Sequence, residues 1–457
     1  MIDFEKDKVF INARKIIKKL RNRGYEAYIV GGFVRDYLLN NIPSDYEIDI
    51  VTSAKPNEIV ALFDKALEVG AKFGVIIVYL DGIQYEVATF RKDARYIDGR
   101  HPEKIIFSNM KEDAKRRDFT INGLYMDPFI KNSQGKYKIF DYVGGIDDLN
   151  KRIIRAIGDP KKRFDEDYLR MLRAIRFYTK LSDLGFKLEK KTLQAIKEKS
   201  QYITQISAER IREELNKILV HKNRVKGLEL LDKTKLLKVI LPEVERMKGI
   251  PQPPEFHPEG DVWIHTLKTL EHIGENPSVE LAWAALLHDV GKPETITIED
   301  RIRFNKHCQK GAEIAENILR RLKFSNEQIK KIVEMVKNHM NFINVPNMRI
   351  AKLKKFVARP TFKDELILHK ADCLASHKDL SIYNFLTKKI EEFKQEDLKP
   401  EPIIKGRDLI AIGLKPGPIF KKILDEVYEL QLENTFETKK EYLEYIKEKY
   451  LSNEKNN

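Results

Sequence analysis

The sequence predicts an α+β fold in which a small mixed sheet near the N-terminus is followed by helical regions. Two observations predict the sheet. An apolar run over 26–30 ends at a glycine pair, and residues 74–89 form two strand-like runs that turn at Asp81-Gly82, a typical hairpin turn. A third observation predicts the helices, because apolar residues recur mainly at helical spacing beyond about residue 150. The 457 residues suffice for about three domains.

The first elements lead into a tight glycine turn. An amphipathic helix over 4–23 and a strand over 26–30 precede Gly31 and Gly32, and a new helix is expected to begin at about Phe33. Glycines let the backbone turn tightly and approach a ligand, and the N–H groups at such a turn and helix start favour phosphate. The turn is therefore a candidate phosphate site.

Three acidic residues follow this turn. Residues 44–52 are expected to form a strand with Asp45, Glu47 and Asp49 at alternate positions. Residues i and i+2 share a strand face about 6.6 Å apart, so neighbouring acids can reach one divalent ion. The pair is either Asp45 with Glu47 or Glu47 with Asp49, because Asp45 and Asp49, about 13 Å apart, need a bulge to meet. Metal beside a phosphate site is what nucleotidyl transfer requires.

Composition bounds the partners and the compartment. The net charge is +14 and the pI is near 9.3, which favours a polyanionic partner such as nucleic acid. No apolar run approaches the roughly 18 residues that span a bilayer, and the N-terminus lacks a signal-peptide pattern. Cys308 and Cys373 form neither a zinc spacing nor a disulfide framework. We therefore expect a cytoplasmic protein without a membrane partner.

Two polar segments add candidate ligand-binding residues. The stretch 116–124 begins with two arginines, whose forked guanidinium groups suit triphosphate oxygens, and its Asp118 and Asn122 would share a helical face and hydrogen-bond ribose. From Asp165 to Phe177 the pattern is again helical. Asp167 and Arg170, three apart, would offer one acceptor group and several donors on one face.

The histidines concentrate in the second half of the chain. A proline-rich stretch over 249–258 indicates a domain boundary, and histidines follow at 265, 272, 288, 307 and 339. His288 and Asp289, at the end of an apolar helix, can both reach a metal ion. Oxygen and nitrogen ligands without thiolate permit Mg, Mn, Ni, Co or Fe, so the pattern does not identify the metal.

Several segments resemble the class II tRNA nucleotidyltransferase and bacterial poly(A) polymerase family. Residues 28–54 resemble its G-G-x-V-R-D, D-x-D and T-S-A signature, with an acidic segment two residues longer. Residues 116–124 resemble R-R-D-F-T-I-N-A-L, with Gly123 in place of Ala, and 166–170 resemble E-D-x-x-R. Residues 90–102 resemble the loop that helps CCA-adding enzymes switch from C to A.

The resemblance implies roles for individual residues. It implies Mg²⁺ bound by Glu47 with Asp45 or Asp49, and selection of the incoming base by Asp167 and Arg170. The residues implied in nucleotide binding are Gly31, Gly32, Arg35, Arg91, Arg117, Asp118, Asn122, Asp167, Arg170, Arg173 and Arg176.

Residues 286–292, Leu-Leu-His-Asp-Val-Gly-Lys, resemble the HD superfamily of metal-dependent phosphohydrolases. This resemblance implies a divalent transition metal held by His265, His288, Asp289 and Asp372. His307 and His339 would then form a second-metal or phosphate group.

Together the resemblances imply a nucleotidyltransferase head (1–150), a helical neck (151–248), an HD domain (249–376) and a helical tRNA-binding tail (377–457). The implied reaction is template-independent addition of C, C and A to the tRNA 3′ end from CTP and ATP, with release of pyrophosphate. The alternatives are an A-adding enzyme, a poly(A) polymerase, an RNA-end phosphohydrolase acting through the HD domain, and a non-catalytic RNA-binding protein. The oligomeric state is not predicted.

Overall fold

The computed structural model describes residues 3–70, 74–93, 105–258, 260–393, 398 and 400–451. The chain divides into two compact units, Met1–Pro242 and Glu243–Asn457. The expected four-domain division stays a prediction, and its proline-rich boundary at 249–258 lies inside the second unit. Most of the polar segment 90–102 lies outside the described residues, so its expected loop structure also stays a prediction.

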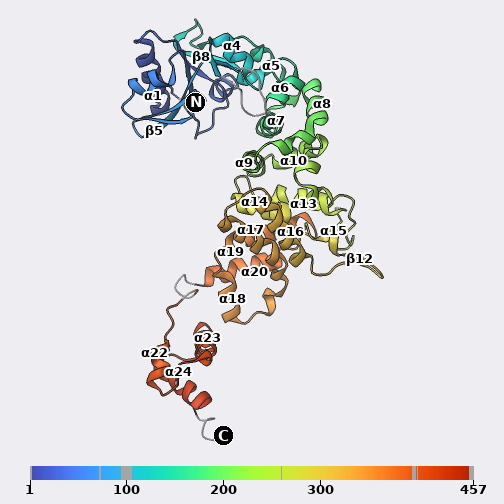
Figure 1. Cartoon of the computed structure of the whole chain (residues 1–457). Helices are drawn as coiled ribbons and strands as arrows, with labels where there is room; N and C mark the ends of the chain where they lie inside the picture. The colour runs from blue at the N-terminus through green and yellow to red at the C-terminus, as the bar shows by residue number, and fades with distance from the viewer. Residues whose placement is uncertain are drawn as a thin grey trace. The chain divides into compact units, whose positions relative to one another are not determined.

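A seven-stranded mixed sheet forms the N-terminal part of the first unit (Figure 1), which confirms the α+β class. Its strand order is β3-β4-β5-β2-β1-β8-β9, with β2 and β5 parallel and the other neighbours antiparallel. The strands are β1 (Ala27–Val30), β2 (Asp49–Thr52), β3 (Ala66–Gly70), β4 (Val75–Leu80), β5 (Ile83–Thr89), β8 (Leu124–Lys131) and β9 (Tyr137–Asp141).

The hairpin between β4 and β5 has the predicted turn. Asp81 and Gly82 both have positive φ values, 52° and 81°, and Leu80 pairs with Ile83. Two positive φ values make a two-residue connection compatible with strand twist. The hairpin prediction is therefore confirmed.

Short helices accompany the sheet. They are α1 (Lys8–Arg21), α2 (Gly32–Leu38), α3 (Pro56–Leu62), α4 (Met110–Arg116) and α5 (Gly145–Lys151), and β6 (Arg91–Asp93) pairs with β7 (Ile105–Phe107). The buried face of α1 carries Phe10, Ile16 and Leu20, as its apolar spacing predicts. The apolar spacing of residues 56–67 predicts one amphipathic helix, but α3 ends at Leu62, because residues 66–70 pair with β4 as an edge strand.

A helical region completes the first unit (Figure 1). Its helices are α6 (Pro160–Glu166), α7 (Leu169–Leu181), α8 (Lys190–Lys199), α9 (Ala208–Leu219), α10 (Arg224–Lys233) and α11 (Leu236–Ile240). A short parallel pair, β10 (Ile153–Ile154) and β11 (Lys187–Leu188), ties the start of this region to the segment after α7. Both α7 and α9 bury an apolar stripe, and they pack against each other.

The second unit is mostly helical. Its longer elements are α13 (Val262–His272), α14 (Val279–Leu287), α16 (His307–Arg321), α17 (Asn326–Asn338), the 3₁₀ segment His339–Asn347, α18 (Ile350–Val357), α19 (Phe362–Ala375), α20 (Ser381–Glu392), α23 (Pro418–Leu432) and α24 (Lys439–Ile446). Shorter elements are α12 (Pro242–Glu245), α15 (Lys292–Thr295), β12 (Ile296–Ile298), β13 (Ile302–Phe304) and α22 (Gly406–Ala411). Within the described residues, no helix has the length and apolarity that crossing a membrane requires.

Candidate active site and metal centre

The glycine turn lies between β1 and α2. Gly31 has φ +79°, a backbone conformation that residues with a side chain rarely adopt, and a Cβ there would lie 3.6 Å from Asp49 Oδ2 and 3.8 Å from Arg117 Nη1. The glycine thus leaves open the space between a carboxylate and a guanidinium group.

The acidic segment is less extended than the sequence predicts. Strand β2 begins only at Asp49, which pairs with Val30, the last residue of β1, while Asp45 lies in a turn. The predicted strand over 44–48 is wrong, because β1 ends at Val30 and offers these residues no partner. Glu47 and Asp49 are nevertheless exposed and flank the buried Ile48, so this pair shares one face.

A third acid that sequence reasoning missed lies beside this pair. Strand β5 runs parallel to β2 with Ile50 opposite Val87, which brings Glu86 next to Asp49. Asp49 is accessible to solvent, yet the surrounding protein atoms, followed by repulsion from Glu86, raise its pKa to about 6. The sequence indicated Glu86 only as an acidic residue at an alternate position of the strand-forming run 83–89. Excess negative charge of this kind fits a divalent cation.

Buried Asp113 orients the two arginines of the 116–124 segment. Its carboxylate lies 2.7 Å from Arg116 Nη2 and 3.2 Å from Arg117 Nη2, and it accepts a 2.8 Å hydrogen bond from the Tyr125 hydroxyl. These guanidinium groups, with the Tyr125 hydrogen bond, keep the pKa of Asp113 below its ordinary value despite burial. Arg117 is therefore held with its Nη1 beside the glycine turn.

The predicted helix over 116–124 is wrong. α4 ends at Arg116, and the Thr120 N–H donates to the Arg155 carbonyl while the Ile157 N–H donates to the Asp118 carbonyl. These backbone hydrogen bonds pair the segment with residues 155–157 and leave only a 3₁₀ turn at Thr120–Asn122. Asn122 still reaches Asp118, with Nδ2 3.3 Å from Oδ1.

Arg35 is almost fully buried, at 2% exposure. Its guanidinium donates two hydrogen bonds to Asp36, at 2.8 and 3.0 Å, and a third to Asn122 Oδ1 at 2.8 Å. The family resemblance implies that Arg35 binds nucleotide, but these contacts let it stabilise the glycine turn from the protein interior. A buried ion pair that loses one partner typically costs 3 to 5 kcal/mol.

Arg35→Met is therefore expected to lower the free energy of unfolding of the first unit by about 3 kcal/mol. The measurement is urea unfolding followed by circular dichroism. The fluorescence emission of Trp263 and Trp283 reports the unfolding of the second unit, which the substitution leaves unchanged. Lys180→Met is the control, because Lys180 binds the same Asp36 from a more exposed position. Normal unfolding with a raised KM for nucleotide would instead place Arg35 on the triphosphate.

Asp118 links the head to the first long helix after it. Arg173, from α7, donates two hydrogen bonds to Asp118 Oδ2, at 2.8 and 2.6 Å. This pairing overcomes the effect of burial and lowers the pKa of Asp118 to about 2. Further along α7, Arg176 lies 2.7 Å from Glu214 of α9.

Asp167 and Arg170 do not share one helix, so that prediction is wrong. α6 ends at Glu166, Asp167 has an extended φ of −155°, and α7 begins at Leu169, whose N–H the Asp167 carboxylate caps at 3.1 Å. The break arises because Asp167 serves as this cap and also accepts from Arg210 Nη2 at 2.8 Å. Arg170 is mostly buried, and its guanidinium donates to the carbonyls of Arg163 and Arg116.

Arg91 lies at the start of β6. Its N–H donates to Asp113 Oδ1 and its carbonyl accepts from Arg116 Nε, at 3.3 and 3.1 Å. Its backbone is thereby joined to the arginines of α4.

Residues 286–292, which resemble the HD superfamily, lie at a second centre in the second unit. Five elements supply its side chains. A Cβ on Gly291 would lie 2.2 Å from the His307 carbonyl and 2.5 Å from the Gly311 nitrogen, so glycine is what lets the end of α14 meet the start of α16. The residues of the centre are His265 (α13), His288 and Asp289 (after α14), His307 and Cys308 (α16), His339 (after α17) and Asp372 (α19).

Three of the imidazoles have a fixed tautomer. The Nδ1 atoms of His288, His307 and His339 lie 2.8, 2.8 and 2.7 Å from backbone carbonyls, which only accept hydrogen bonds. Each Nδ1 therefore carries the proton, and each Nε2 presents a lone pair to the interior. This is the usual arrangement of histidines that bind metal.

The inward-facing atoms form two groups. In the first, His265 Nε2 lies 3.0 Å from Asp372 Oδ1 and 3.3 Å from His288 Nε2. In the second, the Nε2 atoms of His307 and His339 are 3.3 Å apart. Two nitrogen lone pairs at this distance repel each other unless a proton or a cation lies between them. The side chains therefore fit a metal ion in each group.

Asp289 lies between the two groups. Its Oδ2 is 3.2 Å from His288 Nε2, and its Oδ1 is 3.7 and 3.8 Å from the Nε2 atoms of His307 and His339. Lys292, which sequence reasoning missed, contacts Asp289 Oδ2 at 2.7 Å and, followed by His288, holds the pKa of Asp289 far below its ordinary value despite burial. Burial also lowers the pKa of His339 to about 3, which keeps it neutral and able to bind metal.

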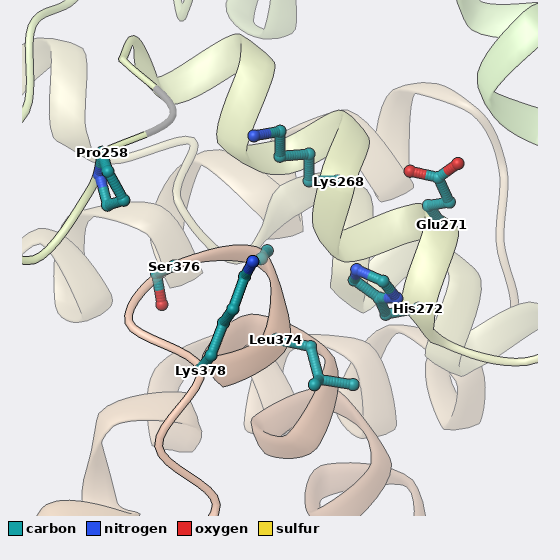
Figure 2. A pocket seen from close by; sticks show the side chains of 8 residues that line it. Pro258, Lys268, Glu271, His272, Leu374, Ser376 and Lys378 are labelled. Carbon is teal, nitrogen blue, oxygen red and sulfur yellow. The ribbon is translucent and has the colours of Figure 1, made fainter.

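A pocket of about 270 Å³ is lined by residues of α13 and of the end of α19 (Figure 2). Lys268 and His272 line it from α13, and Leu374, Ser376 and Lys378 line it from the end of α19 and the following loop. It shares both helices with the centre, but none of its lining residues belongs to the centre. Its charged lining residues are Lys268, Lys378 and Glu271.

Segments in both units of the chain are similar to known protein families. Three family models match: the Poly A polymerase head domain (27–155), the Probable RNA and SrmB-binding site of polymerase A (185–248), and the HD domain (262–376). The CCA-adding enzyme of Lactobacillus helveticus is 33% identical over 95% of this chain and 97% of its own length. That of Bacillus cytotoxicus is also 33% identical, over 96% and 98%.

The chain belongs to the CCA-adding enzyme family. The crystal structure of Bacillus stearothermophilus CCA-adding enzyme in complex with CTP is similar, with a TM-score of 0.73 and 27% identity, and covers 99% of this chain and 100% of that one. Thermotoga maritima CCA-adding enzyme complexed with tRNA has the same fold, with a TM-score of 0.58 at 21% identity, over 96% and 95%.

Membership confirms the family predicted from the glycine turn, the R-R-D segment and the HD motif. The chain is thus a tRNA nucleotidyltransferase that adds CCA, with an HD domain. The metal dependence of such enzymes agrees with the carboxylate cluster at Asp49, and the His and Asp groups of the HD domain could bind metal. The roles of the individual residues stay predictions.

Proposed function

We propose that the chain transfers CMP and AMP from CTP and ATP to the 3′ end of tRNA at the site bounded by Gly31, Asp49 and Arg117. The observation that carries this proposal is the glycine turn, which leaves a gap between the Asp49 carboxylate and Arg117 Nη1. The similarity to a solved enzyme in complex with CTP and the net charge of +14 support nucleotide and RNA as ligands.

Glu47 and Asp49 would hold Mg²⁺ in this proposal, with Glu86 as a third carboxylate. Oxygen ligands suit Mg²⁺, and desolvation by the surrounding protein atoms, followed by repulsion from Glu86 and Glu47, raises the pKa of Asp49, so a cation there would offset this repulsion. When bound, Mg²⁺ neutralises the triphosphate and activates the attacking hydroxyl. The RNA 3′-hydroxyl attacks the α-phosphorus and pyrophosphate leaves, so no protein side chain forms a covalent intermediate.

The arginines would divide between binding and positioning. Arg117 would contact the triphosphate, because buried Asp113 orients it toward the glycine turn. Arg35, Asp118 and Asn122 would act through each other, because their polar atoms are joined in one buried network. These three residues would then support nucleotide binding by holding the glycine turn in its conformation.

Asp167 and Arg170 would select the base. Asp167 is held from one side by Arg210. Arg170 is fixed by two backbone carbonyls and by an ion pair with Glu166, so neither side chain needs to reorganise when nucleotide enters. Donors and acceptors fixed in advance can pair with the edges of C and A. With G or U some of these polar groups would stay unpaired, which disfavours binding of the wrong base.

The test uses tRNA that lacks its CCA end, offered single nucleotides or their mixtures. The unchanged chain should add two C residues from CTP and a terminal A when ATP is also present. Asp167→Ala should reduce correct addition about 10²-fold and raise the relative use of GTP and UTP. Asp165→Ala is the matched control, because this nearby acid pairs with Lys199 at the surface. Addition of A without C by the unchanged chain would refute the proposal.

We also infer a second activity, metal-dependent hydrolysis of phosphate esters at RNA ends by the HD centre. It rests on the inward lone pairs of its histidines and on Asp289, which faces both groups. The pocket lined by α13 and the end of α19 could hold phosphate oxygens through Lys268 and Lys378 (Figure 2).

A further inference from the structure

The second group of the HD centre contains a sulfur ligand that the histidine pattern did not predict. We propose that Cys308 binds metal there together with His307 and His339, so that this site selects Zn²⁺, Co²⁺ or Fe²⁺ over Mg²⁺ and Mn²⁺. This inference rests on the proposed HD metal centre and adds one ligand and a metal preference to it.

The distances between the ligand atoms match one tetrahedral ion. With Zn–N near 2.0–2.1 Å and Zn–S near 2.3 Å, tetrahedral coordination separates two nitrogens by about 3.3 Å and nitrogen from sulfur by about 3.6 Å. The Nε2 atoms of His307 and His339 are 3.3 Å apart, and Cys308 Sγ lies 3.5 Å from His307 Nε2. All three ligand atoms lie within 4.8 Å of one another.

The local backbone explains how adjacent residues reach one ion. Lys306 has a positive φ of 62°, and α16 begins at His307, where the chain turns into the helix. The close packing of Gly291 against the His307 carbonyl and Gly311 holds this helix start against the end of α14. Cys308 follows His307 in the first turn of α16 and is partly buried. The packing that positions His307 therefore also positions the Cys308 Sγ.

The two groups then differ in chemical softness. The first group offers two imidazole nitrogens and a carboxylate oxygen from Asp372. The second offers two imidazole nitrogens and the Cys308 sulfur, which a bound metal would hold as a thiolate, with Asp289 Oδ1 nearby. Thiolate ligands favour Zn²⁺ and related ions, whereas Mg²⁺ and Mn²⁺ prefer oxygen. We therefore expect the second group to retain its metal in excess Mg²⁺.

The other cysteine of the chain provides a matched control. Cys373 is buried with its Sγ 3.7 Å from both ring nitrogens of His369, so it also lies against a histidine. The His369 ring is stacked on Phe342 with centroids 4.4 Å apart, and neither Cys373 nor His369 belongs to a metal-ligand group among the described residues. Cys373→Ser should therefore leave metal binding unchanged.

The experiment titrates the metal-free full chain with Co²⁺ and records its absorption spectrum. The unchanged chain and Cys373→Ser should give the thiolate-to-cobalt charge-transfer band in the near ultraviolet, and Cys308→Ser should lose it while the first group still binds Co²⁺. Zn²⁺ affinity of the second site should fall at least about 10-fold in Cys308→Ser. Bound Zn²⁺ should also slow alkylation of Cys308 in Cys373→Ser, a readout that does not depend on the folding of Cys308→Ser.

Two results would overturn the inference. A charge-transfer band that persists in Cys308→Ser, or alkylation of Cys308 that Zn²⁺ does not slow, would make Cys308 a bystander while the histidine sites stand. Absence of any bound Co²⁺ in all three proteins would refute the HD metal centre together with its sulfur ligand.

Discussion

Asp49→Asn is expected to reduce nucleotide addition about 10³-fold, because the change removes several kcal/mol of metal-dependent transition-state stabilisation. Asparagine keeps the shape of the side chain but loses the charge that lies beside Glu86 and the glycine turn. The measurement is the rate of CMP addition to tRNA lacking its CCA end, in a single turnover with saturating CTP.

The fold should tolerate this change. The pKa of Asp49 is higher in the folded chain than its ordinary value, so ionised Asp49 opposes folding above about pH 6. Removing the charge should leave the melting temperature at pH 8 unchanged or raise it, which separates lost catalysis from unfolding.

Asp45→Asn is the control, because Asp45 lies in a turn four residues before Asp49, where β2 begins. We expect its effect on the rate to stay below about 3-fold. A large loss in Asp45→Asn together with a small one in Asp49→Asn would reverse the assignment of the acid pair.

Local patterns predicted the parts of the fold that local forces determine. The Asp81-Gly82 hairpin and the amphipathic helix α1 follow from turn chemistry and apolar spacing, and both are present. The glycine turn, the R-R-D segment and the HD motif predicted the family through their resemblance to the motifs of known families. Such patterns needed no knowledge of long-range contacts.

The wrong predictions share one physical cause, which is competition from distant partners. Residues 117–123 contain a helical pattern, but backbone hydrogen bonds with 155–157 replace it. Asp167 continues a helical pattern, but its carboxylate caps the next helix and binds Arg210. In both cases tertiary contacts outweigh helix propensity, which differs by less than about 1 kcal/mol per residue for most residue types.

The missed site residues depend on register between separate segments. Glu86 meets Asp49 only because β5 lies parallel to β2 with Ile50 opposite Val87. Cys308 meets His339 because α16 packs against α17, at whose end His339 lies. Neither pairing affects the residue spacing within one segment, so neither could be predicted from a single sequence.

Asp289→Asn should remove metal from both groups of the HD centre, because one carboxylate faces both. The amide that replaces it carries no charge, and its NH₂ group cannot bind a cation. We expect metal content to fall from two ions toward none and phosphate-ester hydrolysis to fall at least about 10²-fold. Metal analysis of the purified chain and hydrolysis of an RNA oligonucleotide with a terminal phosphate measure the two effects.

Asp372→Asn distinguishes a shared ligand from general damage to the centre. Asp372 contacts His265 of the first group at 3.0 Å, so its loss should weaken one ion and leave the thiolate-containing group loaded. Both variants should keep full CCA addition, because the carboxylates of that site lie in the first unit. Equal metal loss in the two variants would contradict the bridging position of Asp289, and lost CCA addition would show that the HD centre also supports the transferase.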